Sequence, residues 1–217
     1  MAADVFAAVP EHELRAAGRR RRFDRGEVVF HRDDPGDSLH RVDSGRFAVR
    51  IITPLGDAAT VALHAPGDVF GLLAVIGAEP RRTATVVALE PSETLAIAAS
   101  VFRRLRDTYP AVRDAVEQLV AAQLAQTSDR LVEALYSPVK VRVLEQLEQL
   151  ARLYGDPSRG DVVIPLSQEH LAGLAGTTRE TVNRILKREE ERGTVTLGRN
   201  RITVRSALAA ASTTAPP

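Results

Sequence analysis

Three charged side chains in one short segment could recognise the edges of nucleic-acid bases. Arg179, Glu180 and Arg184 stand in TTRETVNRILKREEE, where apolar residues recur at helical spacing and would bury the opposite face. An arginine can donate to O6 and N7 of guanine with both arms, and a glutamate can accept from N4 of cytosine. The spacing therefore predicts a helix that reads bases in a DNA major groove.

Local signals predict where this helix and its predecessor begin. Thr177, followed three residues later by Glu180, fits a capping box, so the reading helix is expected to start at Thr178. Ser167 is the expected start of the preceding helix, and Gly176 permits a left-handed turn between the two. A charged helical hairpin with merely solvated side chains is the alternative. The agreement of turn, caps and apolar set favours DNA binding.

A hairpin is predicted after the reading helix. TVTL and RITV flank Gly198-Arg199-Asn200, which completes the pattern of a winged helix-turn-helix. The candidate DNA-binding residues are Ser167, Thr178, Arg179, Glu180, Asn183, Arg184, Lys187 and Arg199. Residues 165–204 contain seven Arg or Lys against five Glu, so the interpretation depends on placement rather than on bulk charge.

The first half of the chain has the pattern of an all-β domain. Segments such as RFAVRII, ATVALH and TLAIA are separated by turn glycines at intervals of roughly 8 to 12 residues, which predicts a sandwich or closed jelly roll. Such small barrels can hold one small ligand. Residues 5–17 are expected to form a short amphipathic helix with Pro10 near a turn, and Arg20 and Arg22 to point outward from a first strand.

The segment GDVFGLLAVIGAEPRRTATV within this half could form a phosphate cradle. Gly71 opens a short apolar segment, and Arg82 and Thr83 follow it, so exposed N–H groups, a guanidinium and a hydroxyl could face one anion. A structural arginine at a strand edge is the alternative.

A long helix is expected next, because no residue from Pro110 to Leu135 breaks a helix. This gives about 26 residues and about 39 Å at a rise of 1.5 Å. One apolar stripe comprises Val116, Val120, Leu124, Leu131 and Leu135, and a second comprises Val112, Ala115, Leu119 and Ala122. A helix that is apolar on two faces needs two covers, which predicts a homodimer packed along it. A monomer that buries both faces is the alternative.

A hinge is predicted between this helix and the next. Ser137 is expected to cap the new helix and Pro138 to take its first position. The expected inner face of that helix comprises Val139, Val143, Leu144, Leu147 and Leu150.

The loop GDPSRGD is expected to be exposed, and the low-complexity residues 206–217 to be disordered.

The segment SQEHLAGLAGTTRETVNRILKREEERG resembles the helix-turn-helix of the catabolite-activator (Crp/Fnr) family of bacterial transcription regulators. The resemblance implies that Arg179, Glu180 and Arg184 contact the bases of a TGTGA-like half-site. Asn183 replaces the glycine of the best-known member, and could add a contact or be solvated.

Residues 67–86 align without gaps with the cyclic-nucleotide cassette of the same family. The resemblance implies phosphate contacts from Gly71, Arg82 and Thr83. It also implies contacts of Thr127 and Ser128, one from each subunit, with the base of cyclic AMP or another cyclic nucleotide. Leu72 stands where the cyclic AMP receptors have a glutamate for the ribose hydroxyl, and losing that hydrogen bond removes roughly 1 to 3 kcal/mol. Weak cyclic AMP binding, another effector and no effector therefore remain open.

Composition argues against several other classes of protein. The chain has no cysteine, which excludes disulfides, cysteine-held iron–sulfur clusters and CxxC zinc sites. The five histidines have no ligand spacing and no catalytic motif occurs, so neither an enzyme nor a metal site is expected. A haem sensor and a nucleotide-binding scaffold are the rival classes. No signal peptide or run of roughly 18 apolar residues occurs, so a cytoplasmic location away from membranes is expected.

These features together predict an α+β protein in four parts. We expect a cyclic-nucleotide-binding-type β jelly roll over residues 1–109, a long dimerisation helix and hinge over 110–136, a winged helix-turn-helix over 137–205 and a tail over 206–217. The expected partners are double-stranded DNA, a second copy of the chain and RNA polymerase. In this family the polymerase can touch a surface loop equivalent to residues 155–161, but here a plain connector is the favoured interpretation of that loop.

Overall fold

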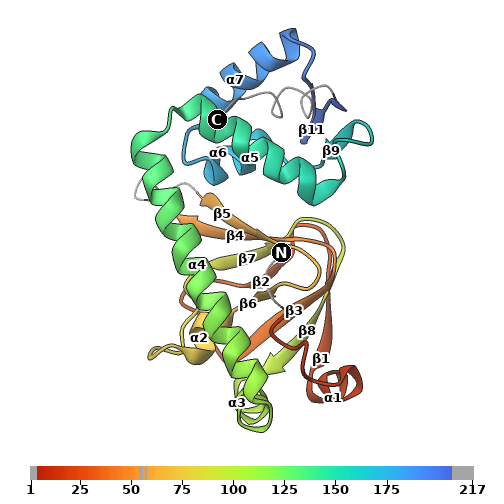
Figure 1. Cartoon of the computed structure of the whole chain (residues 1–217), viewed down its shortest axis with the longest axis vertical. Coiled ribbons are helices and arrows are strands. Elements are labelled where there is room, and N and C mark those ends of the chain that lie inside the picture. The colour runs from red at the N-terminus through yellow and green to blue at the C-terminus, as the bar shows by residue number, and fades with distance from the viewer. Residues whose placement is uncertain (1–3, 54–55, 57, 207–217) are drawn as a thin grey trace. The chain divides into compact units, whose positions relative to one another are not determined.

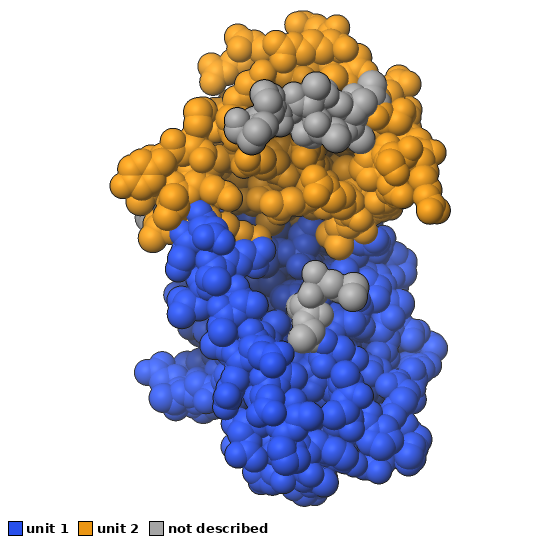
Figure 2. Space-filling model, in the orientation of Figure 1, with its two compact units in different colours: residues 1–129 blue, residues 130–217 orange. Residues whose placement is uncertain are grey.

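The computed structural model describes residues 4–53, 56 and 58–206. The chain divides into two compact units, residues 1–129 and 130–217, which are coloured separately in Figure 2. The boundary falls within a single helix, α4 (Pro110–Tyr136).

The first unit contains a sandwich of two four-stranded sheets, which confirms the predicted β-sandwich (Figure 1). One sheet has the order β1-β8-β3-β6, formed by β1 (Arg19–Phe23), β8 (Ser92–Ala98), β3 (Ser38–Ser44) and β6 (Val69–Phe70). The other has the order β2-β7-β4-β5, formed by β2 (Val28–Phe30), β7 (Thr85–Ala88), β4 (Phe47–Ile52) and β5 (Ala58–His64). All the pairings are antiparallel.

Aromatic side chains occupy the space between the two sheets. Phe23 and Phe70 of the first sheet meet Phe47 of the second, with their ring centroids 5.8 and 5.2 Å from that of Phe47. His40 is buried with them and stacks on Phe70 at a centroid distance of 5.0 Å. Aromatic rings bury large apolar areas and interact in specific geometries, so this cluster stabilises the sandwich.

A second core joins the first sheet to the helices of this unit. These helices are α1 (Glu11–Ala17), α2 (Leu72–Ile76), α3 (Ala99–Thr108) and the first turns of α4. The buried members include Phe6, Leu14, Leu39, Leu72, Ile97, Phe102, Val112 and Val116. The predicted helix over residues 5–17 is therefore too long: residues 5–8 form turns, and α1 begins only after Pro10. Pro10 has an extended backbone and no N–H to donate, so the helix cannot run through it.

The predicted long helix is confirmed by α4, which has 27 residues. Val112 and Val116 are buried and Leu119 is partly buried, so the apolar residues near the start of the helix, from both predicted stripes, pack within the first unit. The apolar residues farther along are exposed in the protomer, by 37% at Val120, 68% at Leu124, 60% at Leu131 and 66% at Leu135. A large apolar surface of α4 therefore lies open in the single chain.

The second unit is a winged helix-turn-helix. After the end of α4 it comprises α5 (Val139–Tyr154), β9 (Val162–Ile164), α6 (Gln168–Leu174), α7 (Arg179–Glu191), β10 (Val195–Gly198) and β11 (Arg201–Val204). The predicted hairpin is confirmed, with Gly198 paired to Arg201 and a positive φ of 54° at Asn200. β9 was not predicted. It is a three-residue run that becomes a strand by pairing with β11.

Two helix starts differ by one residue from the prediction. Thr178, rather than Thr177, caps α7: its hydroxyl accepts from the Thr181 N–H at 3.3 Å, and the helix begins at Arg179. The Thr177 N–H still belongs to the preceding turn, because it donates to the Ala172 carbonyl. At the hinge, Pro138 rather than Ser137 precedes the helix, and Val139 is its first residue. Pro138 has an extended backbone, so helical angles start only after it.

The loop that was expected to be exposed lies between α5 and β9. Gly155, Asp156, Ser158 and Arg159 are exposed. The Ser206 N–H donates to Asp161 at 3.2 Å, and the rest of the predicted tail, residues 207–217, lies outside the described residues. Within the part of the chain that the structure describes, no helix is both long enough and apolar enough to cross a membrane.

Candidate nucleic-acid interface and effector region

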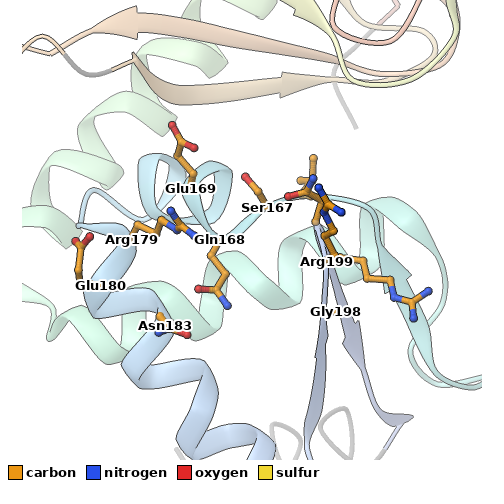
Figure 3. Close-up of a pocket in the computed structure, with 11 residues that line it drawn as sticks. Ser167, Gln168, Glu169, Arg179, Glu180, Asn183, Gly198 and Arg199 are labelled. Atoms are coloured by element: carbon orange, nitrogen blue, oxygen red, sulfur yellow. The ribbon is translucent and has the colours of Figure 1, made fainter.

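A polar hollow in the second unit lies where α6, α7 and the hairpin turn meet (Figure 3). It is lined by Leu166, Ser167, Gln168, Glu169, Arg179, Glu180, Asn183, Gly198, Arg199, Asn200 and Arg201. Five charged side chains line it, and three of these are arginines. Such a surface suits a polar, anionic partner better than an apolar ligand.

The first turns of α7 present their polar residues outward. Arg179, Glu180, Arg184 and Lys187 are exposed and Asn183 is half-buried. The opposite face is anchored as the sequence predicts, since Val182, Ile185 and Leu186 are all buried. The apolar face therefore fixes the rotation of the helix and directs the arginines and the glutamate away from the core.

Both short helices begin at this hollow with side-chain caps. The Ser167 hydroxyl accepts from the His170 N–H at 3.4 Å and lies 2.7 Å from His170 Nδ1. Thr178 caps α7 in the same way. The amino ends of helices carry partial positive charge, so this arrangement favours phosphate oxygens nearby. Arg199, on the hairpin turn, lies on the other side of the hollow in Figure 3.

A buried carboxylate holds the far end of α7. Glu189 accepts from Arg192 Nη1 at 2.8 Å and from the Thr194 hydroxyl at 3.2 Å. Lys140 Nζ of α5 lies 3.4 Å from the same carboxylate. No local signal predicts this anchor, because Glu189 stands in a run of glutamates that resembles a solvated helix face.

The guanidinium of Arg82 in the β-unit is bonded to the chain itself. Arg82 is only 3% exposed, and its Nη1 donates to the carbonyl oxygens of Ser38 and Gly71. Nη2 donates to the Ser38 hydroxyl at 3.1 Å and lies 3.4 Å from Asp37 Oδ1. The guanidinium carbon also lies 4.1 Å from the ring centroid of Phe30. This cation–π contact adds to the polar bonds that hold Arg82 in place.

The other candidate effector residues differ from one another in burial and in the groups that they contact. Gly71 precedes α2 with a φ of 78°, and a Cβ there would lie 2.7 Å from Arg82 Nη1. Leu72 is 6% exposed and packs in the core between the first sheet and the helices. Thr83 is exposed. On α4, the hydroxyls of Thr127 and Ser128 donate to the carbonyl oxygens four residues earlier in their own helix.

Comparison with known proteins assigns both units. Residues 20–109 match the model of the cyclic nucleotide-binding domain, and residues 141–211 match that of the Crp-like helix-turn-helix domain. The Cyclic AMP receptor protein of Thermus thermophilus is 32% identical over 189 residues, which cover 87% of this chain and 85% of that protein. The chain belongs to the Crp/Fnr family of transcription regulators.

Two further proteins are similar to this chain. The CRP-like cAMP-activated global transcriptional regulator of Mycobacterium tuberculosis is 29% identical over 177 residues, covering 81% of this chain and 79% of that protein. The c-di-GMP responsive global regulator CLP of Xanthomonas campestris has the same fold, with a TM-score of 0.76 at 19% identity over 89% of this chain and 97% of that one. The chain is accordingly a transcription regulator with a helix-turn-helix DNA-binding domain.

Several residues at the Crp/Fnr helix-turn-helix were not singled out from the sequence. Gln168, Glu169 and Asn200 line the hollow beside the predicted residues. Gln168 directly follows the predicted cap Ser167, so its position in the first turn of α6 was available as a signal. The place of Asn200 beside α6 depends on how the hairpin packs, for which the sequence offers no local signal.

Proposed function

We propose that two copies of this regulator, joined along α4, read a two-fold-related DNA site with TGTGA-like half-sites. The observation that carries the proposal is the outward display of Arg179, Glu180 and Arg184 on a helix whose opposite face is buried. Two such helices related by a dimer axis would enter successive major grooves about 34 Å apart.

Each polar residue has a distinct part in this proposal. Arg179 and Arg184 donate to guanine, and Glu180 accepts from cytosine, while Asn183 and Lys187 extend the same face. Ser167, Thr178 and Arg199 bind phosphate and so set the register on the duplex. The capped helix starts and the arginine-lined hollow support this division of roles.

The dimer is supported by the exposed apolar side chains of α4. Leu124, Leu131 and Leu135 would each lose a large solvent-exposed area in a helix-to-helix seam. Thr127 and Ser128 lie in the same exposed stretch, where a partner helix would approach.

We further propose that DNA binding by this chain does not depend on cyclic AMP. Leu72 is apolar and packed in the core, so it supplies no acceptor for a ribose hydroxyl. Both terminal nitrogens of Arg82 already donate to oxygens of the chain, so a phosphate would have to displace them. Gly71 and Thr83 by themselves make a weak anion site. Regulation by cyclic AMP or another cyclic nucleotide is the second candidate, which the match of residues 20–109 supports.

RNA polymerase is the further partner we propose, at the exposed loop of residues 155–161. Arg159 pairs with Asp156 at 3.1 Å, and both side chains are exposed. Arg159→Ala should lower transcription from a promoter that contains the bound site without changing DNA affinity. Unchanged transcription in a reconstituted assay would exclude this loop.

Selection of bound sequences from random duplexes tests the DNA proposal. The wild-type protein should enrich a two-fold site, and Arg184→Ala should relax preference at one base position and cost roughly 1 to 3 kcal/mol. Arg199→Ala, the matched control in the hairpin turn, should weaken all sequences alike. Identical effects of the two variants would refute the division between base and phosphate contacts.

Calorimetry and DNA titration test the effector proposal. Cyclic AMP, cyclic GMP and cyclic di-GMP would be titrated into the protein, and the affinity for the selected duplex measured with and without each. We expect the same DNA affinity with and without cyclic AMP. Binding of cyclic AMP that needs its ribose hydroxyl and raises DNA affinity would establish the second candidate instead.

A further inference from the structure

One arginine bonds both to the end of the long helix and to the turn of the helix-turn-helix. Arg142 lies in the first turn of α5, and the acceptors of its side-chain hydrogen bonds are backbone carbonyl oxygens. Its Nε donates to Ala175 at 3.1 Å and its Nη2 to Gly176 at 3.2 Å. Its Nη1 donates to Ser137 at 2.8 Å and, at 3.4 Å, to Ala134.

The chemistry of these acceptors explains why a guanidinium lies here. The last carbonyls of a helix have no donor within the helix and carry partial negative charge. The acceptors of Arg142 lie at or just beyond the carboxyl ends of α4, which ends at Tyr136, and α6, which ends at Leu174. The planar guanidinium donates from Nε and Nη2 to two successive carbonyls of the turn, and from its remaining nitrogen, Nη1, to carbonyls at the end of α4. A lysine ammonium donates from one point and could not hold both.

The hydrogen bonds from Arg142 to the turn fix the start of α7. Gly176 is followed by Thr177 and by the cap Thr178, so α7 begins three residues after the carbonyl that Arg142 holds. The Thr177 N–H donates to the Ala172 carbonyl at 3.0 Å, which ties the turn to α6. The position of Arg142 is thus transmitted to Arg179 through a short and hydrogen-bonded segment.

The connection between α4 and α5, which Arg142 bridges, is short. Only Ser137 and Pro138 separate α4 from α5, and Leu135 and Tyr136 beside it are exposed in the protomer. Pro138 restricts its own φ and disfavours helical angles at Ser137, but neither restriction fixes the direction of α5 relative to α4. The guanidinium therefore supplies a directional link between the two helices that the backbone alone does not.

We propose that Arg142 is a positioning residue that fixes the half-site spacing accepted by the dimer. The inference rests on the proposed two-fold reading of DNA. In a dimer joined along α4, the direction in which each α7 leaves the end of α4 sets the distance between the two readers. When the bridge is lost, the joint adopts a range of directions and several spacings bind almost equally well.

The test uses the full-length protein and duplexes that carry two copies of the selected half-site. The distance between half-site centres is varied in steps of one base pair around one helical turn, and each affinity is measured. A second series keeps the best spacing and changes one base in each half-site. Arg142→Lys and Arg142→Gln are compared with the wild type and with Arg152→Gln, which removes an exposed arginine from the same helix.

The expected outcome separates spacing from base preference. The wild type and Arg152→Gln should show one sharp optimum of spacing. Both Arg142 variants should lower the ratio between the best spacing and its neighbours by roughly fivefold or more. Their discrimination against the changed base should equal that of the wild type, because α7 itself is intact.

Three other outcomes would overturn the proposal. A sharp wild-type optimum that both Arg142 variants retain means that Arg142 does not set the spacing. Equal loss of spacing and base preference, with lower thermal stability, would mean that Arg142 only supports folding of the second unit. A flat spacing profile in the wild type would refute the two-fold reading itself, and the inference with it.

Discussion

At the scale of single residues, the β-unit contains a histidine that burial keeps neutral. His40 is 4% exposed, stacks on Phe70, and its Nδ1 lies 3.0 Å from the Thr94 hydroxyl. The pKa of His40 is lowered from 6.5 to about 3, first by burial and then by the charges of Arg82 and Arg21, against a smaller opposing effect of Asp37. A neutral ring is thus part of the aromatic cluster between the sheets.

This pKa predicts that acid weakens the β-unit. Below about pH 6.5 the unfolded chain binds a proton at His40 that the folded chain does not, so the free energy of unfolding falls as the pH drops toward 3. The slope from this group is at most about 1.4 kcal/mol per pH unit. Between pH 6.5 and 5, the free energy of unfolding, measured with denaturant, should fall less steeply with decreasing pH in His40→Gln than in the wild type. His12→Gln, at an exposed position, is the control, and its free energy of unfolding should depend on pH as in the wild type. The same pH dependence in all three proteins would contradict the assignment.

Glu189 is the buried residue whose loss should matter most at the far end of α7. Glu189→Ala removes the acceptor for Arg192 and Thr194, but the arginine is half-exposed and water can solvate it. We therefore expect a loss of about 1 to 2 kcal/mol in the unfolding of the second unit. Glu191→Ala, at an exposed position of the same helix, should cost less than about 0.5 kcal/mol. Equal midpoints of denaturation for the two variants would show that the carboxylate of Glu189 contributes nothing.

At the scale of elements, the helix-turn-helix is defined by its caps and by the turn between them. Ser167 and Thr178 each satisfy one N–H at the start of a helix, and Gly176 takes the left-handed backbone that the turn needs. Arg142 then bonds the turn to the end of α4. The proposed recognition by α7 would thus depend on interactions that do not touch DNA.

The cap of α7 can be tested with two adjacent threonines. Thr178→Ala removes the hydroxyl that accepts from Thr181, and should lower the unfolding free energy of the second unit by about 1 kcal/mol. Thr177→Ala keeps the backbone N–H that bonds to Ala172, so it should cost less. Thermal denaturation of both variants decides between the two positions. A larger loss at Thr177 would restore the capping box with Glu180.

At the scale of the whole molecule, the open apolar surface of α4 argues for a second chain. Leu124, Leu131 and Leu135 are each at least 60% exposed, and a contiguous exposed apolar surface of this kind usually marks an interaction site. A helix that is buried near its start and exposes apolar residues farther along leaves a surface that a second copy of the helix would cover.

The dimer prediction is tested by Leu124→Asp. A charge in the centre of the seam should be desolvated on association, so sedimentation should show a monomer at concentrations where the wild type is dimeric. Val163→Asp, at a residue on β9 that is likewise more than half exposed, is the control and should leave the dimer intact. A Leu124→Asp protein as dimeric as the wild type would exclude this seam.

The sequence by itself determined the features that depend on short-range pattern. The apolar period of α7, the glycine of the turn, the β-branched segments between turn glycines and the unbroken run from Pro110 all act over a few residues, so they can be recognised in one chain. Even there, local pattern misplaced the cap of α7 by one residue. The exact start of a helix depends on which threonine keeps an extended backbone.

The tertiary structure alone decided features that join distant residues. β9 becomes a strand only by pairing with β11, nearly forty residues later in the chain, and Arg82 is bonded by oxygens of Ser38 and Gly71 from two other elements. Leu72 is packed in the core, and Arg142 finds its acceptors only where the ends of two helices converge. Such contacts depend on how the chain folds back on itself. The sequence therefore specified the type of most elements, whereas the fold decided which polar groups are bonded within the chain and which are left exposed.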